Sequence, residues 1–191
     1  MKGEGKKGFE ITHDAIYLIN GNGEMSVNNT VNSNNPKLVV GRMGVRLMLN
    51  KQLDQISYFG RGPMENYSDR KRGFDVGIYS SSILEQLTPY EKPMDCGNHE
   101  DVRWVTISQK DKQGIHVTSD KNLMQITALP FTDEELEIPE YKIDLPKSSA
   151  TVLCISHKTL GVGSAGCGPR PLEQYLVYAG PASFTYTVKI Q

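Results

Sequence analysis

The chain of 191 residues lacks the features that mark several specialised classes of protein. Its three cysteines, Cys96, Cys154 and Cys167, lie far apart and have neither the paired spacing of a zinc site nor the density of a disulfide scaffold. Such sparse and odd cysteine use is typical of a reducing compartment, so we expect a cytoplasmic protein. An excess of charge is missing too, because 21 basic and 22 acidic residues leave a net charge of −1. This balance argues against a nucleic-acid partner.

Long apolar runs are also absent. No segment has the length that a membrane-spanning helix needs, so we expect no membrane partner. Residues 1–8 are rich in lysine and glycine and precede no apolar stretch, so they do not form a signal peptide. We expect them to be disordered or to derive from a tag. With 38% hydrophobic and 23% charged residues, the composition is that of a soluble globular domain.

What the sequence does have is alternation of apolar and polar residues with a period of two, which is typical of β-strands. Residues 183–190 show it most clearly, since every second side chain is aromatic or aliphatic and those between are serine, threonine and lysine. The asparagine-rich residues 28–35 predict a polar strand or an exposed loop. Further strands are expected at residues 15–19, 43–49, 55–59, 101–108, 114–119, 122–128, 151–157 and 173–179.

Turns and one short helix complete the pattern. Residues 20–23, Asn-Gly-Asn-Gly, predict a hairpin turn because asparagine and glycine tolerate positive φ. Thr132 and Glu135 predict a capping box at the start of a helix, which Pro139 limits to about two turns. Many short strands and a single helix indicate an all-β fold, an antiparallel sandwich. No repeat or linker divides residues 1–191, so we expect a single domain.

The first dense polar stretch, residues 59–70, reads F-G-R-G-P-M-E-N-Y-S-D-R. Its glycines could cradle a phosphate, but the lysine of a P-loop and a following helix are missing. On residue chemistry alone a rigid turn is favoured, in which two arginines pair with Glu65 and Asp69 and tie neighbouring strands together.

The second polar stretch, residues 90–104, holds Asp95, Cys96, His99, Glu100 and Asp101. A zinc site needs ligands from a second segment, and no other histidine or cysteine has ligand spacing, so we expect a polar loop and no metal. Trp104, the only tryptophan, alternates with Val102 and Thr106, which predicts a core position rather than a sugar-binding platform. No cysteine has an activating neighbour and no carboxylate pair is placed for glycoside chemistry, so we predict no catalytic residue here.

The order of these segments resembles one known family. Residues 58–70 resemble the signature G-x-G-P-x-E-N-Y-x-D-R of the C-terminal domain of glycoside hydrolase family 2 β-galactosidases. The resemblance runs from about residue 40 to the end, and the family's domain is longer, so we expect its upstream part to be missing. The later pieces follow in the family's order: Pro89-Tyr90-x-x-Pro93, Gly97-Asn98, Asp101-Val102-Arg103-Trp104, Pro130-Phe131-Thr132-x-Glu134-Glu135-Leu136, Leu160-Gly161-Val162-Gly163 and Cys167-Gly168-Pro169.

The resemblance implies a fold and an activity. The family's domain is a β-supersandwich of the galactose-mutarotase-like type, which agrees with the strand pattern. The whole enzyme hydrolyses terminal β-D-galactosides with retention, using two glutamates on a barrel domain that also holds magnesium and sodium ions. That barrel is not in this chain. The resemblance therefore implies a partner barrel domain or large chain, a galactoside substrate, no cofactor bound here, and no activity of the chain alone.

The resemblance also implies roles for particular residues. Residues 161–169 match a loop that reaches the active-site rim and carries a tryptophan in some members. Cys167 stands near the position of that tryptophan and has a smaller apolar area. The difference implies a weaker sugar contact, a contact made by another residue, or a natural substrate other than lactose. The substrate-rim candidates are Cys167, Gly166, Gly168 and, from a second loop, His99. The residues expected to fix the signature and the contact to the barrel are Arg61, Glu65, Asn66, Tyr67, Asp69, Arg70, Arg103 and Trp104.

Two other functions stay open. One is a free-standing carbohydrate-binding or mutarotase-like sandwich, whose acid and base would be His99 with Glu100, or His116 with His157. Neighbouring residues on a strand point to opposite faces, which counts against the first pair. The other is an interaction subunit, a homo-oligomer included, that pairs through open sheet edges.

Overall fold

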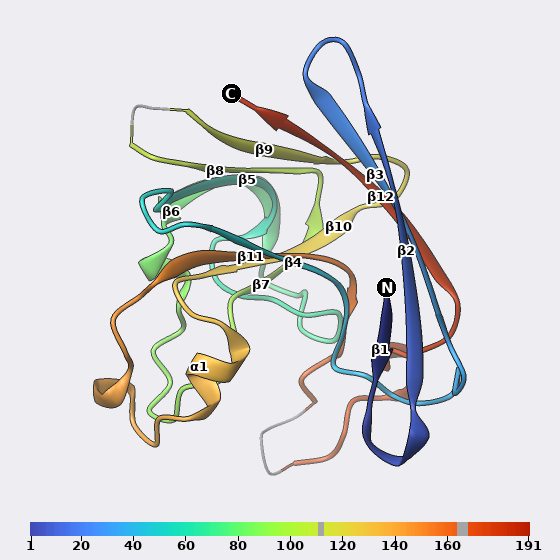
Figure 1. Ribbon diagram of the computed structural model, residues 1–191. Helices are drawn as coiled ribbons and strands as arrows, with labels where there is room; N and C mark the ends of the chain where they lie inside the picture. Colours follow the sequence, from blue (N-terminus) through green and yellow to red (C-terminus); the bar gives the residue numbers. More distant parts are fainter. Residues whose placement is uncertain (111–112, 164–167) are drawn as a thin grey trace.

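The computed structural model describes residues 1–110, 113–163 and 168–191, which form two antiparallel sheets packed face to face (Figure 1). The large sheet has eight strands in the order β1 (Lys2–Glu4), β2 (Glu10–Ile19), β3 (Glu24–Ser33), β12 (Ala182–Ile190), β9 (Gly114–Ser119), β8 (Trp104–Ser108), β5 (Gln55–Gly62) and β6 (Asp75–Ser82). The small sheet has four, in the order β4 (Arg42–Asn50), β11 (Ala150–Thr159), β10 (Met124–Leu129) and β7 (Asn98–Val102). The expected all-β sandwich is confirmed.

The core lies between the sheets, where every second side chain of the central strands is buried. On β5 and β8 these side chains are Ile56, Tyr58, Val105 and Ile107, each at most 1% exposed. They form one cluster with residues of the small sheet such as Leu153. Fully burying a side chain of this size stabilises the fold by roughly 1.5–3 kcal/mol, so the alternation seen in the sequence fixes which face of each strand points inward.

Helical structure is limited to short pieces. The helix α1 (Asp133–Glu137) begins at the expected capping box, with Thr132 Oγ1 accepting from the Glu135 N–H at 3.1 Å and Glu135 Oε2 accepting from the Thr132 N–H at 2.8 Å. Its Leu136 is fully buried beside Leu129. The 3-10 turns are η1 (Lys6–Gly8), η2 (Leu84–Gln86), η3 (Lys142–Asp144) and η4 (Glu173–Tyr175). None of the described helices has the length and apolar character needed to cross a membrane.

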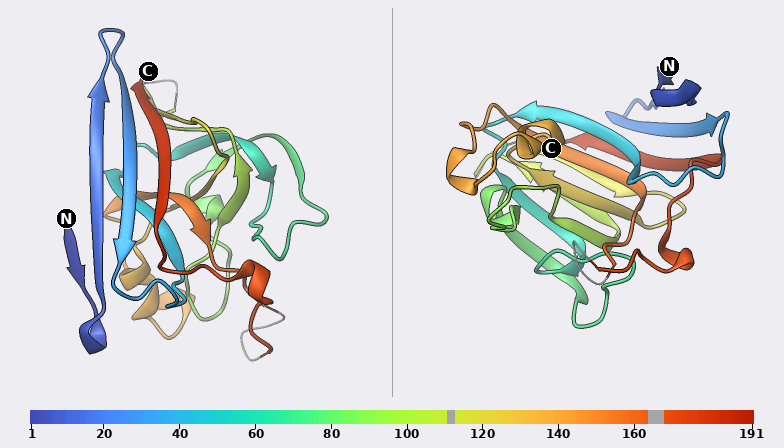
Figure 2. Two further views of the ribbon diagram at one scale, coloured as in Figure 1. Left: turned by 90° about the vertical axis from the view of Figure 1, so that its right-hand side faces the viewer. Right: turned by 90° about the horizontal axis from the view of Figure 1, so that it is seen from below.

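The hairpin β2–β3 turns at residues 20–23 as predicted, with Gly23 at a φ of 80° and the Gly23 N–H donating to the Asn20 carbonyl at 3.0 Å. The hairpin stands at one side of the molecule, and its tip projects beyond the small sheet (Figure 2). Apolar side chains near the tip are therefore exposed on both faces of β2, and Ile16 and Ile19 are 62% and 78% exposed. The small sheet covers only part of the large one.

The structure corrects the prediction that Trp104 lies in the core. The expected single strand at 101–108 is divided at Arg103, so that β7 belongs to the small sheet and β8 to the large one. Asp101 adopts a φ of 55° just before this change. The alternation consequently shifts by one residue, because Val102 and Val105 are both fully buried. Trp104 points to the outer face of the large sheet and is half-buried.

Two other segments differ from the strand predictions. Residues 173–179, expected as a strand, form the turn η4 and a single β-bridge from Tyr178 to Val39. Residues 75–82 form the edge strand β6, which the sequence pattern did not reveal because glycines and serines replace its apolar positions. For the polar residues 28–35 the strand alternative is confirmed, since most of them lie in β3. Within residues 1–8, expected to be disordered or tag-derived, Lys2–Glu4 pairs with β2.

Candidate functional site

Glu65 is the centre of the signature segment. Its carboxylate is buried, and it accepts hydrogen bonds from four groups: the Tyr90 hydroxyl at 2.6 Å, the Gly97 N–H at 2.7 Å, Arg70 Nη2 at 2.8 Å and the Tyr67 hydroxyl at 3.2 Å. Burial acts to raise the pKa of Glu65, but the donors from Tyr90, Gly97 and Arg70 outweigh it and hold this pKa below its usual value. The two polar stretches of the sequence thus meet at one ionised carboxylate.

Asn66 joins the same two stretches through its amide group. Its side chain is fully buried, and Nδ2 donates to the carbonyls of Arg61 and Met64, both at 3.0 Å. Its Oδ1 accepts from the Glu100 N–H at 2.9 Å, and its own N–H donates to the Asn98 carbonyl at 2.7 Å. Each of these bonds satisfies a backbone group that would be costly to leave unpaired in the interior.

His99 lies inside the sandwich, with 1% of its surface exposed. Its Nδ1 is 3.0 Å from the Tyr58 hydroxyl and from the Arg61 carbonyl oxygen, and its Nε2 is 2.6 Å from Gln86 Oε1. Burial lowers the pKa of His99 to about 4, so the ring is neutral at pH 7. The structure therefore places this rim candidate in a buried hydrogen-bond network rather than at a surface.

An ion-pair network holds the turn between β7 and β8. Asp101 is 2.5 Å from Arg61 Nε and 2.9 Å from Lys71 Nζ. Lys71 is also 3.1 Å from Glu100, whose side chain is 2% exposed. Burial acts to raise the pKa of Asp101, but Lys71 and Arg61 outweigh it and lower this pKa. The pKa of Glu100 is raised, because its deeper burial outweighs the attraction of Lys71.

Arg103 and Trp104 lie beside this network, on the outer face of the large sheet. The Arg103 guanidinium is 5.0 Å from the centre of the Phe59 ring, and its Nη1 donates to the Asp101 carbonyl at 2.6 Å. The Trp104 ring is 5.7 Å from the His116 ring. The aromatic rings and the guanidinium face away from the core.

Asp69 connects the signature to the predicted rim loop. Its Oδ1 accepts from the Val162 N–H at 3.1 Å and its Oδ2 from the Gly163 N–H at 2.8 Å. A Cβ atom at residue 161 would lie 2.6 Å from Asp69 Oδ2, so the close approach requires Gly161. Asp69 itself is held in a turn that the Arg70 N–H closes by donating to the Tyr67 carbonyl at 2.8 Å.

The described ends of the rim loop lie close together. Gly163 has a φ of 72°, and a Cβ atom there would be 2.6 Å from the Pro169 carbonyl oxygen. Gly168 is described and exposed. The rim candidates Gly166 and Cys167 lie outside the described residues.

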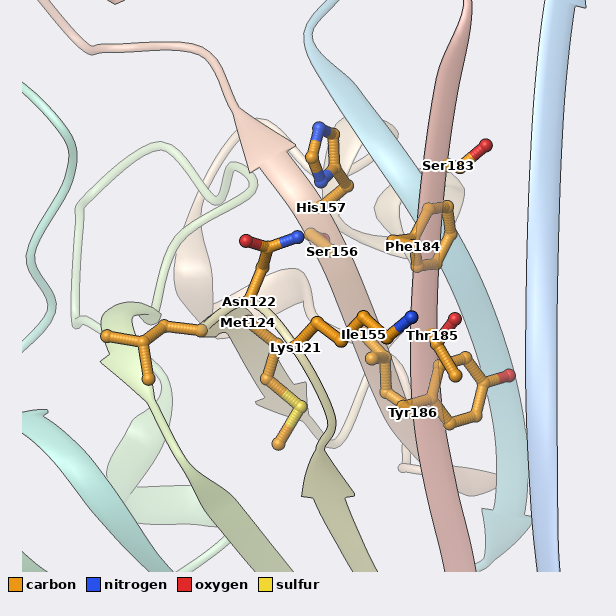
Figure 3. Close-up of a pocket in the computed structure, with 11 residues that line it drawn as sticks. Lys121, Asn122, Met124, Ile155, Ser156, His157, Ser183, Phe184, Thr185 and Tyr186 are labelled. Atoms are coloured by element: carbon orange, nitrogen blue, oxygen red, sulfur yellow. The ribbon is translucent and has the colours of Figure 1, made fainter.

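Two cavities of the structure are lined by candidate residues. One, of about 580 Å³, opens beside Glu65 and Arg70 and is otherwise lined mainly by residues 85–89 of the η2 segment. The other, of about 190 Å³, lies between β11 and β12 (Figure 3). There the ring of His157 stacks on Phe184 with 5.9 Å between their centres, and burial lowers the pKa of His157.

Neither acid–base pair considered for a mutarotase-like protein is arranged to act on one substrate in the structure. His157 lies between the sheets, whereas His116 is on the outer face of the large sheet, so these two do not share a site. No aspartate or glutamate lines the cavity beside His157. His99 is engaged with Gln86, and Glu100 with Lys71. Within residues 1–110, 113–163 and 168–191, no three metal-ligating side chains come together.

Comparison with known proteins decides the family. The family described as "Beta galactosidase small chain" matches residues 4–190. The chain belongs to the β-galactosidase small-chain family. A β-galactosidase of Priestia megaterium (strain DSM 319 / IMG 1521) is 33% identical over 177 residues, which is 91% of this chain and 17% of the relative. A β-galactosidase of Actinobacillus pleuropneumoniae is 30% identical over 171 residues, which is 88% of this chain and 16% of that relative.

A third relative, the β-galactosidase of Arthrobacter sp. (strain B7), is 32% identical over 136 residues, or 69% of this chain and 13% of its own length. This member of the small-chain family thus spans less than a fifth of the curated relatives it matches. The resemblance read from the signature is confirmed at the level of the family.

Sequence reasoning missed three partners of the network: Tyr58, Lys71 and Gln86. Lys71 directly follows the last arginine of the signature, and this position is the one signal that pointed to it. Tyr58 is the first residue of the range 58–70 and fits the alternation of a buried strand, but it was assigned no role. Gln86 carried no signal, because its contact to His99 depends on the fold bringing η2 beside β7.

Proposed function

We propose that this chain is the C-terminal part of a family 2 β-galactosidase, which hydrolyses terminal β-D-galactosides with retention. The names of the relatives support the activity. The chain covers only a small share of their length, which supports placing the catalytic groups in the remaining part of the enzyme. The two glutamates of a retaining enzyme stand about 5–5.5 Å apart and face the substrate. The buried acids described here, Glu65 and Glu100, are each consumed by structural hydrogen bonds.

The role proposed for the chain is to support assembly and to complete the rim of the active site with the loop at residues 161–169. One observation carries this role: Asp69 of the signature accepts hydrogen bonds from Val162 and Gly163 at the start of that loop. These two hydrogen bonds tie the signature to the start of the loop that the proposal places at the active-site rim.

The proposal includes a large chain or barrel domain as partner, with the galactoside bound mainly there. Magnesium and sodium ions belong to the barrel of the whole enzyme, and no cofactor is proposed for this chain. The proposal includes a cytoplasmic location, which the sparse use of cysteine supports; Cys96 and Cys154 are free and buried.

Activity measured in two pieces tests the proposal. The large piece is the Priestia megaterium relative without the 177 residues that this chain matches. We expect neither piece alone to hydrolyse a chromogenic galactoside and the two together to do so. A second version of the test joins the same two pieces in one polypeptide, so that activity no longer depends on the affinity between them.

Two results would contradict the proposal. Turnover by the chain alone would show that it carries its own catalytic groups. A folded fusion without activity would show that this chain cannot replace the segment it matches.

A further inference from the structure

One row of side chains crosses the outer face of the large sheet at its β6 end. Residues directly opposite each other on neighbouring strands share a face of a sheet. Phe59 of β5 is opposite Ile78 of β6 on one side and opposite Trp104 of β8 on the other. The row Ile78–Phe59–Trp104 is therefore apolar across three consecutive strands. It continues with Thr118 of β9, where it becomes polar.

This row faces away from the core. Its sequence neighbours Tyr58 and Val105 are fully buried between the sheets, so Phe59 and Trp104 point outward. Ile78 is 67% exposed, and Val76, two residues before it on the same face, is 39% exposed. Sheet faces that meet water usually carry polar side chains, as the adjacent row of Ser57, Thr106 and His116 does.

A cation borders the apolar row. The Arg103 guanidinium stacks 5.0 Å from the Phe59 ring and gives one hydrogen bond to a backbone carbonyl. The neighbouring Arg61 and Lys71 are neutralised by Asp101 and Glu100. No carboxylate of the described part of the chain lies within ion-pair distance of Arg103. Its charge is available to a partner.

We propose that Ile78, Val76, Phe59, Trp104 and Arg103, here named the outer patch, form the surface on which the large chain docks. The inference rests on the proposed function and names the contact surface for its partner. The relatives contain more than four-fifths of their length outside the matched segment, so in each of them a large body is joined to the segment that this chain matches. Tryptophan, other aromatics and arginine are the side chains enriched at the energetic centre of protein interfaces.

The charge of the outer patch favours a large chain over a second copy. A symmetric dimer through this surface would bring two unpaired Arg103 side chains into one interface, and like charges there weaken binding. A large chain can present a carboxylate to Arg103. The patch also adjoins the Arg61–Asp101 pair of the signature, which joins it to the site already described.

Two matched substitutions test which end of the sheet docks. Ile78→Thr alters the outer patch, and Ile16→Thr makes the same change at the far end of the same sheet face, where Ile16 is 62% exposed. We expect Ile78→Thr to raise the Kd for the large piece of the Priestia megaterium relative about tenfold, and Ile16→Thr to leave it unchanged. The opposite ranking, or an equal effect, would overturn the proposal.

The single tryptophan supplies a direct readout. The chain is labelled with 5-fluorotryptophan, so its fluorine NMR spectrum has one resonance, from Trp104. We expect this resonance to shift when the unlabelled large piece is added. An unchanged resonance while the pieces bind and activity appears rejects the outer patch and leaves the proposed function standing. Absence of both binding and activity, in the pair and in the fusion, rejects the two together.

Two further controls identify a wrong occupant. A shift that grows with the concentration of the chain alone assigns the surface to a second copy. A shift on adding lactose without the large piece assigns it to a sugar. Either result overturns the docking of the large chain at this surface.

Discussion

Each oxygen of the Asp69 carboxylate accepts a hydrogen bond from a different backbone N–H group. A side chain with one acceptor atom cannot replace both bonds. An amide in its place offers a single carbonyl oxygen and turns an N–H group toward a second N–H. Hydrogen bonds to an ionised acceptor are stronger than those between neutral groups. The start of the rim loop therefore depends on the charge as well as the shape of this side chain.

Asp69→Ala is expected to speed amide hydrogen exchange at Val162 and Gly163 by about tenfold or more, because each loses a hydrogen bond to a charged group worth roughly 1.5–3 kcal/mol. Exchange monitored by NMR on the isolated chain measures this. Glu134→Gln is the matched control, since Glu134 is an exposed carboxylate that binds Arg46 elsewhere on the surface. Unchanged exchange at both amides would mean that Asp69 does not hold the loop.

His99 is expected to make stability depend on pH. Its pKa is about 6.5 in an unfolded chain and about 4 in the fold, so the unfolded state takes up a proton first as the pH falls. The stabilisation of the neutral ring is fully present above pH 6.5 and is lost progressively down to pH 4, by on the order of 3 kcal/mol.

His99→Gln keeps a polar side chain that does not titrate. The free energy of unfolding, measured with urea, should fall more for the wild type than for this variant when the pH is lowered from 7 to 4.5. Parallel pH profiles of the two proteins would contradict the buried neutral histidine.

At the residue scale, the sequence located the signature and one of its ion pairs, because Arg70 pairs with Glu65 as predicted. Asp69 was expected to pair with an arginine but instead accepts hydrogen bonds from backbone N–H groups. The spacing of Glu65, Asn66 and Asp69 was recognisable as a motif, and its arginine–carboxylate pairing was predicted in kind. The actual partner of Arg61 is Asp101, which lies 40 positions away. Pairings of this length are set by the packing of the two sheets, and no local pattern encodes them.

At the scale of elements, the sequence predicted strands correctly where one face of the strand is apolar. Strands β4, β5, β9 and β12 show clear alternation, and the capping box fixed the start of α1. Strands β10 and β11 are buried at consecutive positions and were predicted from apolar stretches. Strand β6 has glycine and tyrosine on its inner face and could not be found by apolar period. The change of sheet at Arg103 reversed the face of Trp104, because one extra residue inverts every later side chain.

The capping box makes a prediction at this scale. Thr132→Ala removes the acceptor for the Glu135 N–H and is expected to lower the free energy of unfolding by about 1 kcal/mol. Ser149→Ala, at an exposed position, is the control and should change it by less than about 0.5 kcal/mol. Urea unfolding measures both. Equal losses would show that the cap contributes nothing specific.

At the scale of the whole molecule, the eight-stranded sheet faces a sheet of four strands. Strand β2 consequently carries solvent-exposed apolar side chains on both faces. On the face that points toward the small sheet, Tyr17 and Ile19 are 59% and 78% exposed. Exposed apolar side chains close to a sheet edge promote pairing between molecules.

We therefore expect the isolated chain to self-associate through this strand, and Ile19→Lys to reduce that association without lowering the melting temperature. Light scattering coupled to gel filtration measures the mass, and circular dichroism the melting. Ile155→Lys is the contrasting variant and should unfold the chain, because Ile155 is 1% exposed. An unchanged mass for Ile19→Lys would mean that the hairpin tip does not mediate association.

The anchor at Asp69 has a consequence for the order of folding. Its bonds to Val162 and Gly163 join residues 93 and 94 positions apart. Contacts between distant residues carry a large loop-closure entropy and form slowly, whereas a local hairpin such as β2–β3 closes early. The start of the rim loop is thus held in place only when the segments that follow β5 and β11 have met, so we expect protection of the Gly163 amide to appear late in folding.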